Sequence, residues 1–173
     1  MMPTSTPSAA TTSSSTRHSS ALTNAPLAQT GSRWRVLIVD PHTSVREMIR
    51  VILDGYSDLI EVAGEASDAE TAIELANTMA VDLVLLDAHL PNGVDAIRQI
   101  KRVLPQVVIM GMSAEYLPYL YNTLIAAGTV GFVRMEDAPD LLFRSIVFAL
   151  CTYGHMHRHV HPAHTPIHAA SLV

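Results

Sequence analysis

The chain has 173 residues, of which 16 are Asp or Glu and 11 are Lys or Arg, so that its formal net charge is −5. All 16 acidic residues lie between Asp40 and Asp140, and we expect no direct contact with nucleic acid, because such binding depends on neutralising phosphates. A single cysteine excludes an internal disulfide and no apolar run has membrane-spanning length, so we expect a protein of the reducing cytoplasm that does not enter a membrane.

Composition divides the chain into three parts. Residues 1–33 are mostly Ser, Thr, Ala and Pro, with too few large apolar side chains to offset the entropy of folding. We expect a disordered tail there and disfavour an organelle-targeting peptide, because arginine is sparse. Residues 34–150 are predicted to form one domain, and residues 151–173 a tail rich in His and Pro. That tail does not suit a three-helix DNA-binding module, so we expect a stand-alone domain.

Short apolar runs alternate with amphipathic segments along the domain. In chain order, strands are predicted at 36–39, 60–64, 83–86, 107–110 and 131–133, and the mixed composition of the second is typical of an edge strand. Between them, apolar stripes with helical spacing begin at Val45 and Ala69, and further helices are predicted at 94–103, 117–127 and 138–150. This alternation predicts an α/β fold with a five-stranded parallel sheet and helices on both faces.

Polar residues indicate where three of the helices begin. Ser44 and Ser67 each precede a glutamate by three residues, which is the spacing of a capping box. In that motif the serine hydroxyl accepts a hydrogen bond from a backbone N–H of the first helical turn. Asp137 is expected to cap the last helix, with Pro139 in its first turn.

Two of the predicted strands end in a carboxylate. The run VLIVD ends at Asp40, and the run LVLLD ends at Asp87. Since the carboxyl ends of parallel strands meet at the edge of the sheet where α/β proteins bind ligands, we expect both carboxylates to face one acidic site. Such a pair points to a cation and a phosphoryl group.

Several segments together resemble a known family. They are, in order, VLIVDPHTSVREMIRVIL, GEASDAETAIELA, VDLVLLDAHLP, MSAE and AAGTVGF. Their order and spacing resemble those of the receiver domains of bacterial response regulators, over about residues 35–150. The resemblance implies the flavodoxin-like (βα)5 receiver fold, a role in two-component phosphorelay signal transduction, and a phosphoprotein that is not itself an enzyme.

The resemblance implies roles for the residues of the acidic site. Asp87 corresponds to the phosphoacceptor of the family. Asp40, Asp87 and the backbone carbonyl of His89 correspond to the ligands of its Mg²⁺ ion.

The resemblance also implies a switch and a partner surface. Ser113 corresponds to the hydroxyl that turns towards the phosphoryl group, and Phe132 corresponds to the aromatic switch residue. Arg134 lies on the face where receivers usually contact a partner. The implied partners are a histidine kinase, an output protein or a second copy of the chain.

The chain departs from the family pattern at three places. Pro41 stands where the family usually has a second acid, Met135 stands where it has a lysine, and the loop LPNGVDAI after Asp87 is about two residues shorter than usual. Phosphoryl transfer depends on positioning and charge neutralisation, so the loss of an acid and a cation is expected to weaken both Mg²⁺ binding and phosphorylation. We therefore expect an atypical receiver, or pseudo-receiver, that acts by protein–protein interaction.

Other functions compete with this interpretation. One is an ordinary phosphoacceptor response regulator of a phosphorelay. Another is a metal-binding protein on a receiver scaffold, because alternating imidazoles suit Zn²⁺, Ni²⁺ or Cu²⁺, although a flexible polar tail is the simpler interpretation. The four alternating residues are His155, His157, His159 and His161. A small doubly wound enzyme is disfavoured, because the turn after the first strand has no glycine-rich phosphate cradle.

Overall fold

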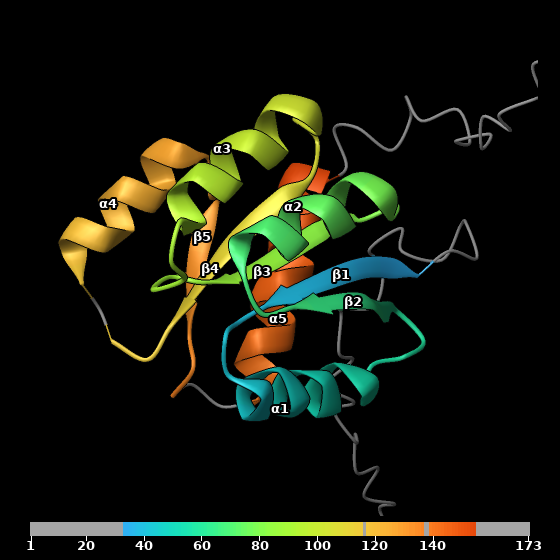
Figure 1. Ribbon diagram of the computed structural model, residues 1–173. Helices are drawn as coiled ribbons and strands as arrows, with labels where there is room; N and C mark the ends of the chain where they lie inside the picture. Colours follow the sequence, from blue (N-terminus) through green and yellow to red (C-terminus); the bar gives the residue numbers. More distant parts are fainter. Residues whose placement is uncertain (1–32, 116, 137–138, 155–173) are drawn as a thin grey trace, which may run out of the picture. The chain divides into compact units, whose positions relative to one another are not determined.

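The computed structural model describes residues 33–115, 117–136 and 139–154 (Figure 1). The expectations for the tail at 1–32 and for the cap at Asp137 lie outside the described residues. So do those for the four tail histidines, His155, His157, His159 and His161. Within the described part, no helix is long and apolar enough to cross a membrane.

Five strands form a single parallel sheet, as the sequence predicts. The strands are β1 (Trp34–Val39), β2 (Ile60–Ala66), β3 (Leu83–Asp87), β4 (Val108–Ser113) and β5 (Gly131–Arg134). Their order in the sheet is β2-β1-β3-β4-β5, and each neighbouring pair is parallel. The predicted edge strand β2 does lie at one edge, and the four-residue β5 forms the other. The short, apolar strands β1, β3 and β4 are therefore covered on both faces, which explains their continuous apolar sequences.

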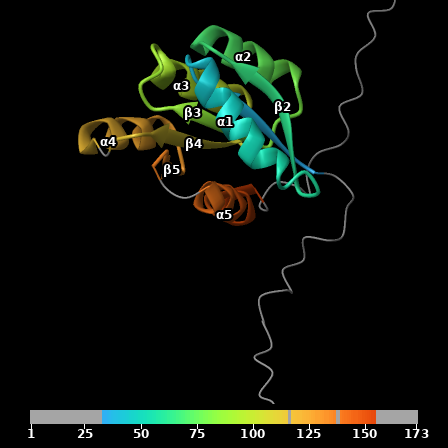
Figure 2. The same ribbon diagram turned by 90° about the horizontal axis from the view of Figure 1, so that it is seen from below.

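Five helices cover the two faces of the sheet. They are α1 (Thr43–Asp54), α2 (Ala69–Thr78), α3 (Gly93–Val103), α4 (Pro118–Ala127) and α5 (Pro139–Ala149). Helices α1 and α5 pack on one face, and α2, α3 and α4 pack on the other (Figure 2). The alternation of strand and helix thus gives the flavodoxin-like fold expected from the sequence.

The core consists of two apolar layers, one on each side of the sheet. On β1, Leu37 and Val39 face the layer beneath α2, α3 and α4, whereas Val36 and Ile38 face the layer beneath α1 and α5. All four side chains are fully buried. This two-sided burial fixes the strand register, because a shift by one residue would exchange the two layers.

The helix starts correct two of the predicted caps. Helix α1 begins after His42, without a side-chain cap, so Ser44 lies inside the first turn and caps nothing. Helix α2 begins after Asp68, whose carboxylate accepts a hydrogen bond of 2.8 Å from the Thr71 backbone N–H. Asp68 is therefore the N-cap of α2, one residue after the predicted cap Ser67. The prediction that Pro139 stands in the first turn of α5 is confirmed.

The last helix continues past the boundary expected at residue 150. Residues Leu150–Gly154 form a π-helical turn directly after α5. Leu150 is fully buried in the layer beneath α1 and α5, and Gly154 lies next to the ring of the buried Trp34. Through these contacts residues 150–154 pack on the layer that contains the start of β1.

Candidate functional site

The two strand-ending carboxylates meet at the carboxyl edge of the sheet. Strands β1 and β3 are neighbours, with Val39 paired to Leu86, so Asp40 and Asp87 follow at the same level. Asp40 is buried, with 5% of its surface exposed, and Asp87 is half-buried. The negative charge of Asp40 acts on Asp87. The structure therefore places both acids in one site, as the strand pattern implies.

The turn after β1 holds the Asp40 carboxylate in place. Its Oδ1 atom accepts a hydrogen bond of 2.7 Å from the backbone N–H of His42, and Nδ1 of the His42 ring lies 3.1 Å from the same oxygen. The backbone carbonyl of Asp40 accepts a hydrogen bond of 2.7 Å from Nη1 of Arg46, a residue of the first turns of α1. Asp40 is thus fixed from both its side chain and its backbone.

Asp87 lies in surroundings that disfavour its charge. Burial raises the pKa of the Asp87 carboxyl above its usual value, a hydrogen bond of 3.2 Å from the His89 backbone N–H acts in the opposite direction, and the charge of Asp40 raises the pKa further. The ring Nδ1 of His89 lies 3.8 Å from Oδ1 of Asp87. Among the described residues, no lysine or arginine forms an ion pair with Asp87.

Met135 and Pro41, two of the three departures from the family pattern, lie at the edge of this site. The Met135 backbone N–H donates a hydrogen bond of 3.0 Å to the carbonyl of Ser113, so Met135 stands just past the end of β5 beside β4. Its half-buried side chain packs against the apolar layer beneath α1 and α5. Pro41 is exposed next to Asp40 and has no polar side-chain atom.

The donor atoms of the site fit a hard cation in kind but are few in number. Asp40 and Asp87 offer carboxylate oxygens and His89 offers a backbone carbonyl, and Mg²⁺ prefers oxygen ligands. The charge of Asp40 raises the cost of ionising Asp87, and a cation bound at the site would offset that cost. Within the described residues, no group of three or more His, Cys, Asp or Glu side chains is arranged to hold a metal ion. A bound Mg²⁺ would therefore keep several water ligands.

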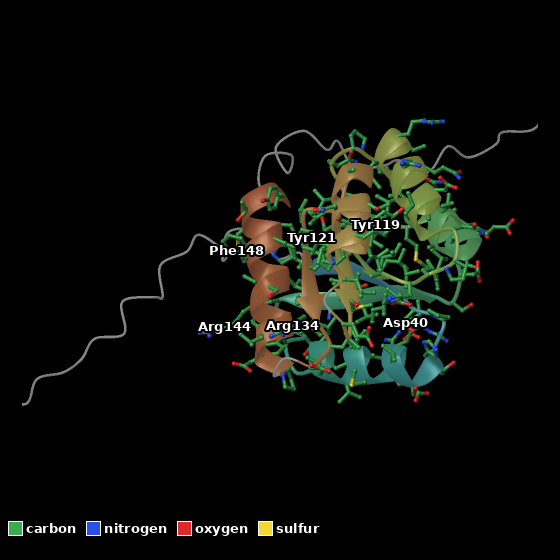
Figure 3. All side chains as sticks on the ribbon, turned by 90° about the vertical axis from the view of Figure 1, so that its left-hand side faces the viewer. Asp40, Tyr119, Tyr121, Arg134, Arg144 and Phe148 are labelled. Carbon is green, nitrogen blue, oxygen red and sulfur yellow. The ribbon has the colours of Figure 1, made fainter. Side chains whose placement is uncertain are left out.

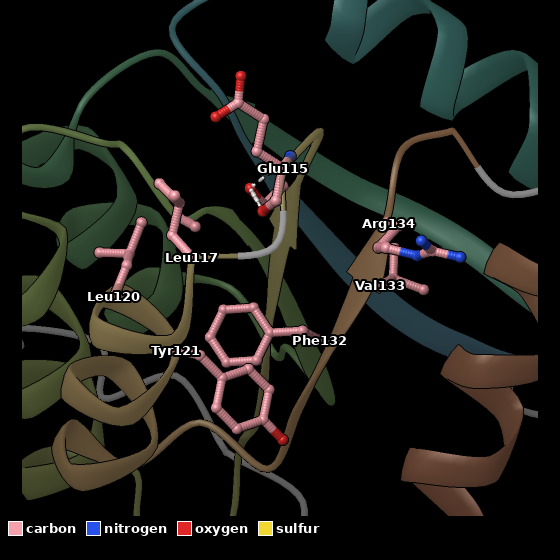
Figure 4. A pocket seen from close by; sticks show the side chains of 9 residues that line it. Glu115, Leu117, Leu120, Tyr121, Phe132, Val133 and Arg134 are labelled. Atoms are coloured by element: carbon pink, nitrogen blue, oxygen red, sulfur yellow. Dashed lines mark hydrogen bonds between the residues drawn. The ribbon is translucent and has the colours of Figure 1, made fainter.

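Ser113 is buried at the end of β4, but its hydroxyl is bonded within its own loop. Its Oγ donates a hydrogen bond of 2.7 Å to the carbonyl of Glu115 and accepts one of 3.2 Å from the Glu115 N–H. Figure 4 draws these two bonds as dashed lines. In this arrangement the hydroxyl stabilises the turn that leads into α4.

Phe132 forms an aromatic pair with Tyr121, next to Ser113. The two ring centroids are 4.5 Å apart, with 34° between the ring planes. The pair lines a pocket of about 200 Å³ together with Ala88, Ser113 and neighbouring apolar side chains. Figure 4 shows the two rings side by side, and Arg134 extending away from them. We refer to the rings of Tyr121 and Phe132 as the aromatic wall.

A second pocket, of about 410 Å³, lies on the outer side of the aromatic wall. Tyr121 and Phe132 also line this one, together with Arg144, Phe148 and Tyr153. Phe148 has 68% of its surface exposed and Tyr119, on α4, has 84%. Figure 3 labels Arg134, Arg144 and Phe148 along β5 and α5, with the two tyrosines on α4. We call the surface formed by Tyr119, Tyr121, Arg134, Arg144 and Phe148 the outer face.

Two residues that contribute to these sites were missed at the sequence level. Arg46 donates a hydrogen bond to the backbone carbonyl of Asp40. Its position in the first turns of a helix after a strand-ending acid could have predicted this contact, because helical side chains point back towards the helix N-terminus. Gly111 lies under the Phe132 ring, and the signal was a glycine inside the apolar run VVIMGMS.

Comparison with known proteins identifies relatives of the whole domain. The family described as the response regulator receiver domain matches residues 36–146. The chain is 32% identical over 121 residues to the Fimbriae Z protein of Salmonella typhimurium, covering 69% of this chain and 57% of that protein. It is 36% identical over 113 residues to the response regulator UvrY of Escherichia coli K12, covering 64% of this chain and 51% of that protein. The chain therefore spans about half the length of the curated relatives it matches.

Solved structures show the same fold. A LuxR-family two-component response regulator from Aurantimonas sp. SI85-9A1 matches with a TM-score of 0.65 and 28% identity, over 70% of this chain and 87% of that one. The isolated REC domain of RcsB from Salmonella enterica serovar Typhimurium, determined with the phosphomimetic BeF3−, matches with a TM-score of 0.60 and 23% identity, over 67% of this chain and 87% of that one. The chemotaxis protein CheY4 of Vibrio cholerae matches with a TM-score of 0.62 and 21% identity, over 69% of this chain and 100% of that one.

Proposed function

Since the chain belongs to the family of response regulator receiver domains, we propose that it is an atypical member, in which phosphorylation of Asp87 is slow or absent and signalling depends on binding a partner protein. The observation that carries this proposal is the charge around Asp87. The charge of Asp40 raises the pKa of Asp87 and those of His89 and His42 lower it, and no lysine or arginine among the described residues forms an ion pair with Asp87. A phosphoryl group on Asp87 would add negative charge beside Asp40, and among the described residues no lysine or arginine is paired with Asp87 to offset that charge.

A bound Mg²⁺ ion would also change the charge around Asp87. Receiver domains typically bind Mg²⁺ at the phosphorylation site, and in this chain Asp40, Asp87 and the His89 carbonyl would hold it. The ion would supply positive charge to the transferring phosphoryl group. With Pro41 in place of an acid, one direct ligand is replaced by water, which Mg²⁺ tolerates at a cost in affinity.

The proposal is tested by labelling the purified chain with acetyl phosphate and Mg²⁺ and following the Asp87 adduct by intact-protein mass spectrometry. We expect slow and incomplete labelling. Each of the substitutions Pro41→Asp and Met135→Lys should raise the rate about tenfold or more, because each restores a charge that acts on the transition state. The double variant should exceed the product of the single effects, since metal and cation act on the same phosphoryl group.

Matched controls separate charge from packing. Met135→Leu keeps an apolar side chain of similar volume and Pro41→Ala removes the ring without adding a carboxylate, so neither should change the rate. Asp87→Ala should abolish the label. Rapid, stoichiometric labelling of the unsubstituted chain would overturn the proposal.

An ordinary phosphoacceptor function is the second candidate, and the relatives favour it. UvrY of Escherichia coli is named a response regulator, and NarP of the same organism is named a nitrate/nitrite response regulator. The labelling rate of the unsubstituted chain distinguishes the two candidates directly.

We place the partner contact of the proposed function on the outer face. It combines the highly exposed Tyr119 and Phe148 with Arg144, and a pocket of about 410 Å³ lies within it. Large exposed aromatic side chains beside an arginine are typical of the central residues of protein interfaces. A partner protein or a second copy of the chain would bury them.

A further inference from the structure

Gly111 occupies an unusual position for a glycine, within the fully buried strand β4, which lies between β3 and β5. Glycine weakens a strand interior, so its presence there indicates that another group approaches the backbone closely. That group is the ring of Phe132, which is the partner of Gly111 in the β4–β5 register. A Cβ atom on Gly111 would lie 2.5 Å from Cδ1 of Phe132 and closer still to Cε1. The ring therefore occupies the space that any other residue at 111 would fill.

The same ring is held on its other side by Tyr121. The centroid distance of 4.5 Å and the tilt of 34° place the two rings in direct contact. Phe132 is thus enclosed between the bare backbone of β4 and a side chain of α4. Turning it outwards would leave the space over Gly111 empty and would break the ring contact.

The position of this ring matters because the aromatic wall stands between the two pockets. The pocket of about 200 Å³ is lined by Ala88, which follows Asp87, and by Ser113. The pocket of about 410 Å³ is lined by Arg144 and Phe148. Both pockets are lined by Tyr121 and Phe132. The conformation of Phe132 therefore sets the shape of both pockets at once.

From these contacts we infer that close packing on the Gly111 backbone locks the Phe132 ring over β4, so that the outer face keeps one conformation whether or not Asp87 is modified. The inference deepens the proposed function, on which it rests for its regulatory meaning: a receiver that acts without phosphate needs its partner surface already formed. The packing of Phe132 against Gly111 and Tyr121 is tested without phosphate and without a partner protein.

The first test is a double-mutant cycle on the full chain, measured by thermal unfolding. Gly111→Ala should lower the melting temperature by roughly 4–12 °C, because the added methyl group overpacks against the ring. In the Phe132→Ala background the same substitution should cost little or should stabilise the strand, because the ring is gone. An equal loss in both backgrounds would overturn the inference.

Gly131 provides a matched control. It lies in the neighbouring strand β5, and a Cβ atom there would have nothing within 4 Å. Gly131→Ala should therefore have the same small effect with and without Phe132. If Gly111→Ala alone fails to fold while the double variant with Phe132→Ala folds, the coupling is shown directly; failure of both variants would count against it.

The second test follows the ring itself by ¹⁹F NMR on protein labelled with fluorophenylalanine. The chain has three phenylalanines, and Phe132→Leu assigns the resonance of interest. We expect a single Phe132 resonance without microsecond-to-millisecond exchange in relaxation dispersion. Exchange at Phe132 would refute the lock, whereas the labelling rate of Asp87 tests the proposed function separately.

Discussion

Asp87 is a carboxylate that the fold keeps partly out of water, at the end of β3 beside Asp40. Burial and the charge of Asp40 raise its pKa, and the single backbone hydrogen bond from His89 offsets this only in part. The native state therefore binds a proton more tightly than the unfolded chain. Stability must then fall as the pH rises from the usual value of 3.8 through the raised pKa of the folded protein.

At the residue scale, we predict that Asp87→Asn stabilises the protein at pH 7 in the presence of a chelator. The neutral amide has the same shape and avoids the cost of a half-buried charge. The gain should exceed about 0.5 kcal/mol, the usual range of surface substitutions, and should disappear below pH 3.8, where both states bind the proton. Thermal unfolding at the two pH values measures it. Glu47→Gln, at an exposed position of α1, is the control, and an equal gain there would contradict the prediction.

At the element scale, the start of α2 depends on one side chain. The carboxylate of Asp68 accepts hydrogen bonds from the backbone N–H and the hydroxyl of Thr71, and the backbone bond is the main reason that the pKa of Asp68 is lowered. A lowered pKa means that the cap stabilises the fold above pH 3.8 and that its contribution is lost as the pH falls through the pKa of the folded state. Ser67 only donates a hydrogen bond to Asp68.

We therefore predict that Asp68→Ala lowers the melting temperature at pH 7 clearly more than Ser67→Ala does. The difference between Asp68→Ala and the unsubstituted chain should shrink as the pH is lowered below 3.8, since the protonated carboxyl is a poorer acceptor for the cap. Circular dichroism melts over a pH series give both values. If Ser67→Ala proved the more damaging change, the capping box read from the sequence would be correct after all.

At the scale of the whole molecule, the outer face is the surface on which the proposed function depends. Its aromatic side chains come from α4 and α5, and β5 between them contributes Arg134. Exposed apolar side chains also occur on α1, where Val51 has 73% of its surface exposed. The surface of α1 is therefore a second candidate for contact, and it is separate from the outer face, which adjoins the aromatic wall.

We predict that the chain self-associates through the outer face at high concentration, and that Phe148→Asp weakens this association at least tenfold. A buried aromatic anchor is usually worth more than 1.4 kcal/mol, which corresponds to a factor of ten. Sedimentation equilibrium measures the association. Val51→Asp introduces the same charge on α1 and should leave it unchanged. Loss of association in Val51→Asp but not in Phe148→Asp would place the contact on α1.

The chain itself determined the order of elements, the parallel sheet and the two acids of the site. These follow from local patterns: apolar runs of strand length between helical stripes, and an acid at the end of each of two strands. The replacements at Pro41 and Met135 are equally visible in the sequence. The sequence placed the cap of α2 one residue too early, because Ser67 and Asp68 are both good caps and only the backbone of the turn selects Asp68.

Tertiary structure alone decided where the side chains around the acids point. The hydroxyl of Ser113 bonds to Glu115, and the ring of Phe132 lies over Gly111. The helical turn Leu150–Gly154 packs beside Trp34, which lies at the other end of the domain sequence. Each of these contacts depends on strand register or on residues distant in the chain. Periodicity shows which face a residue occupies, but the neighbour it meets there is set only when the layers pack.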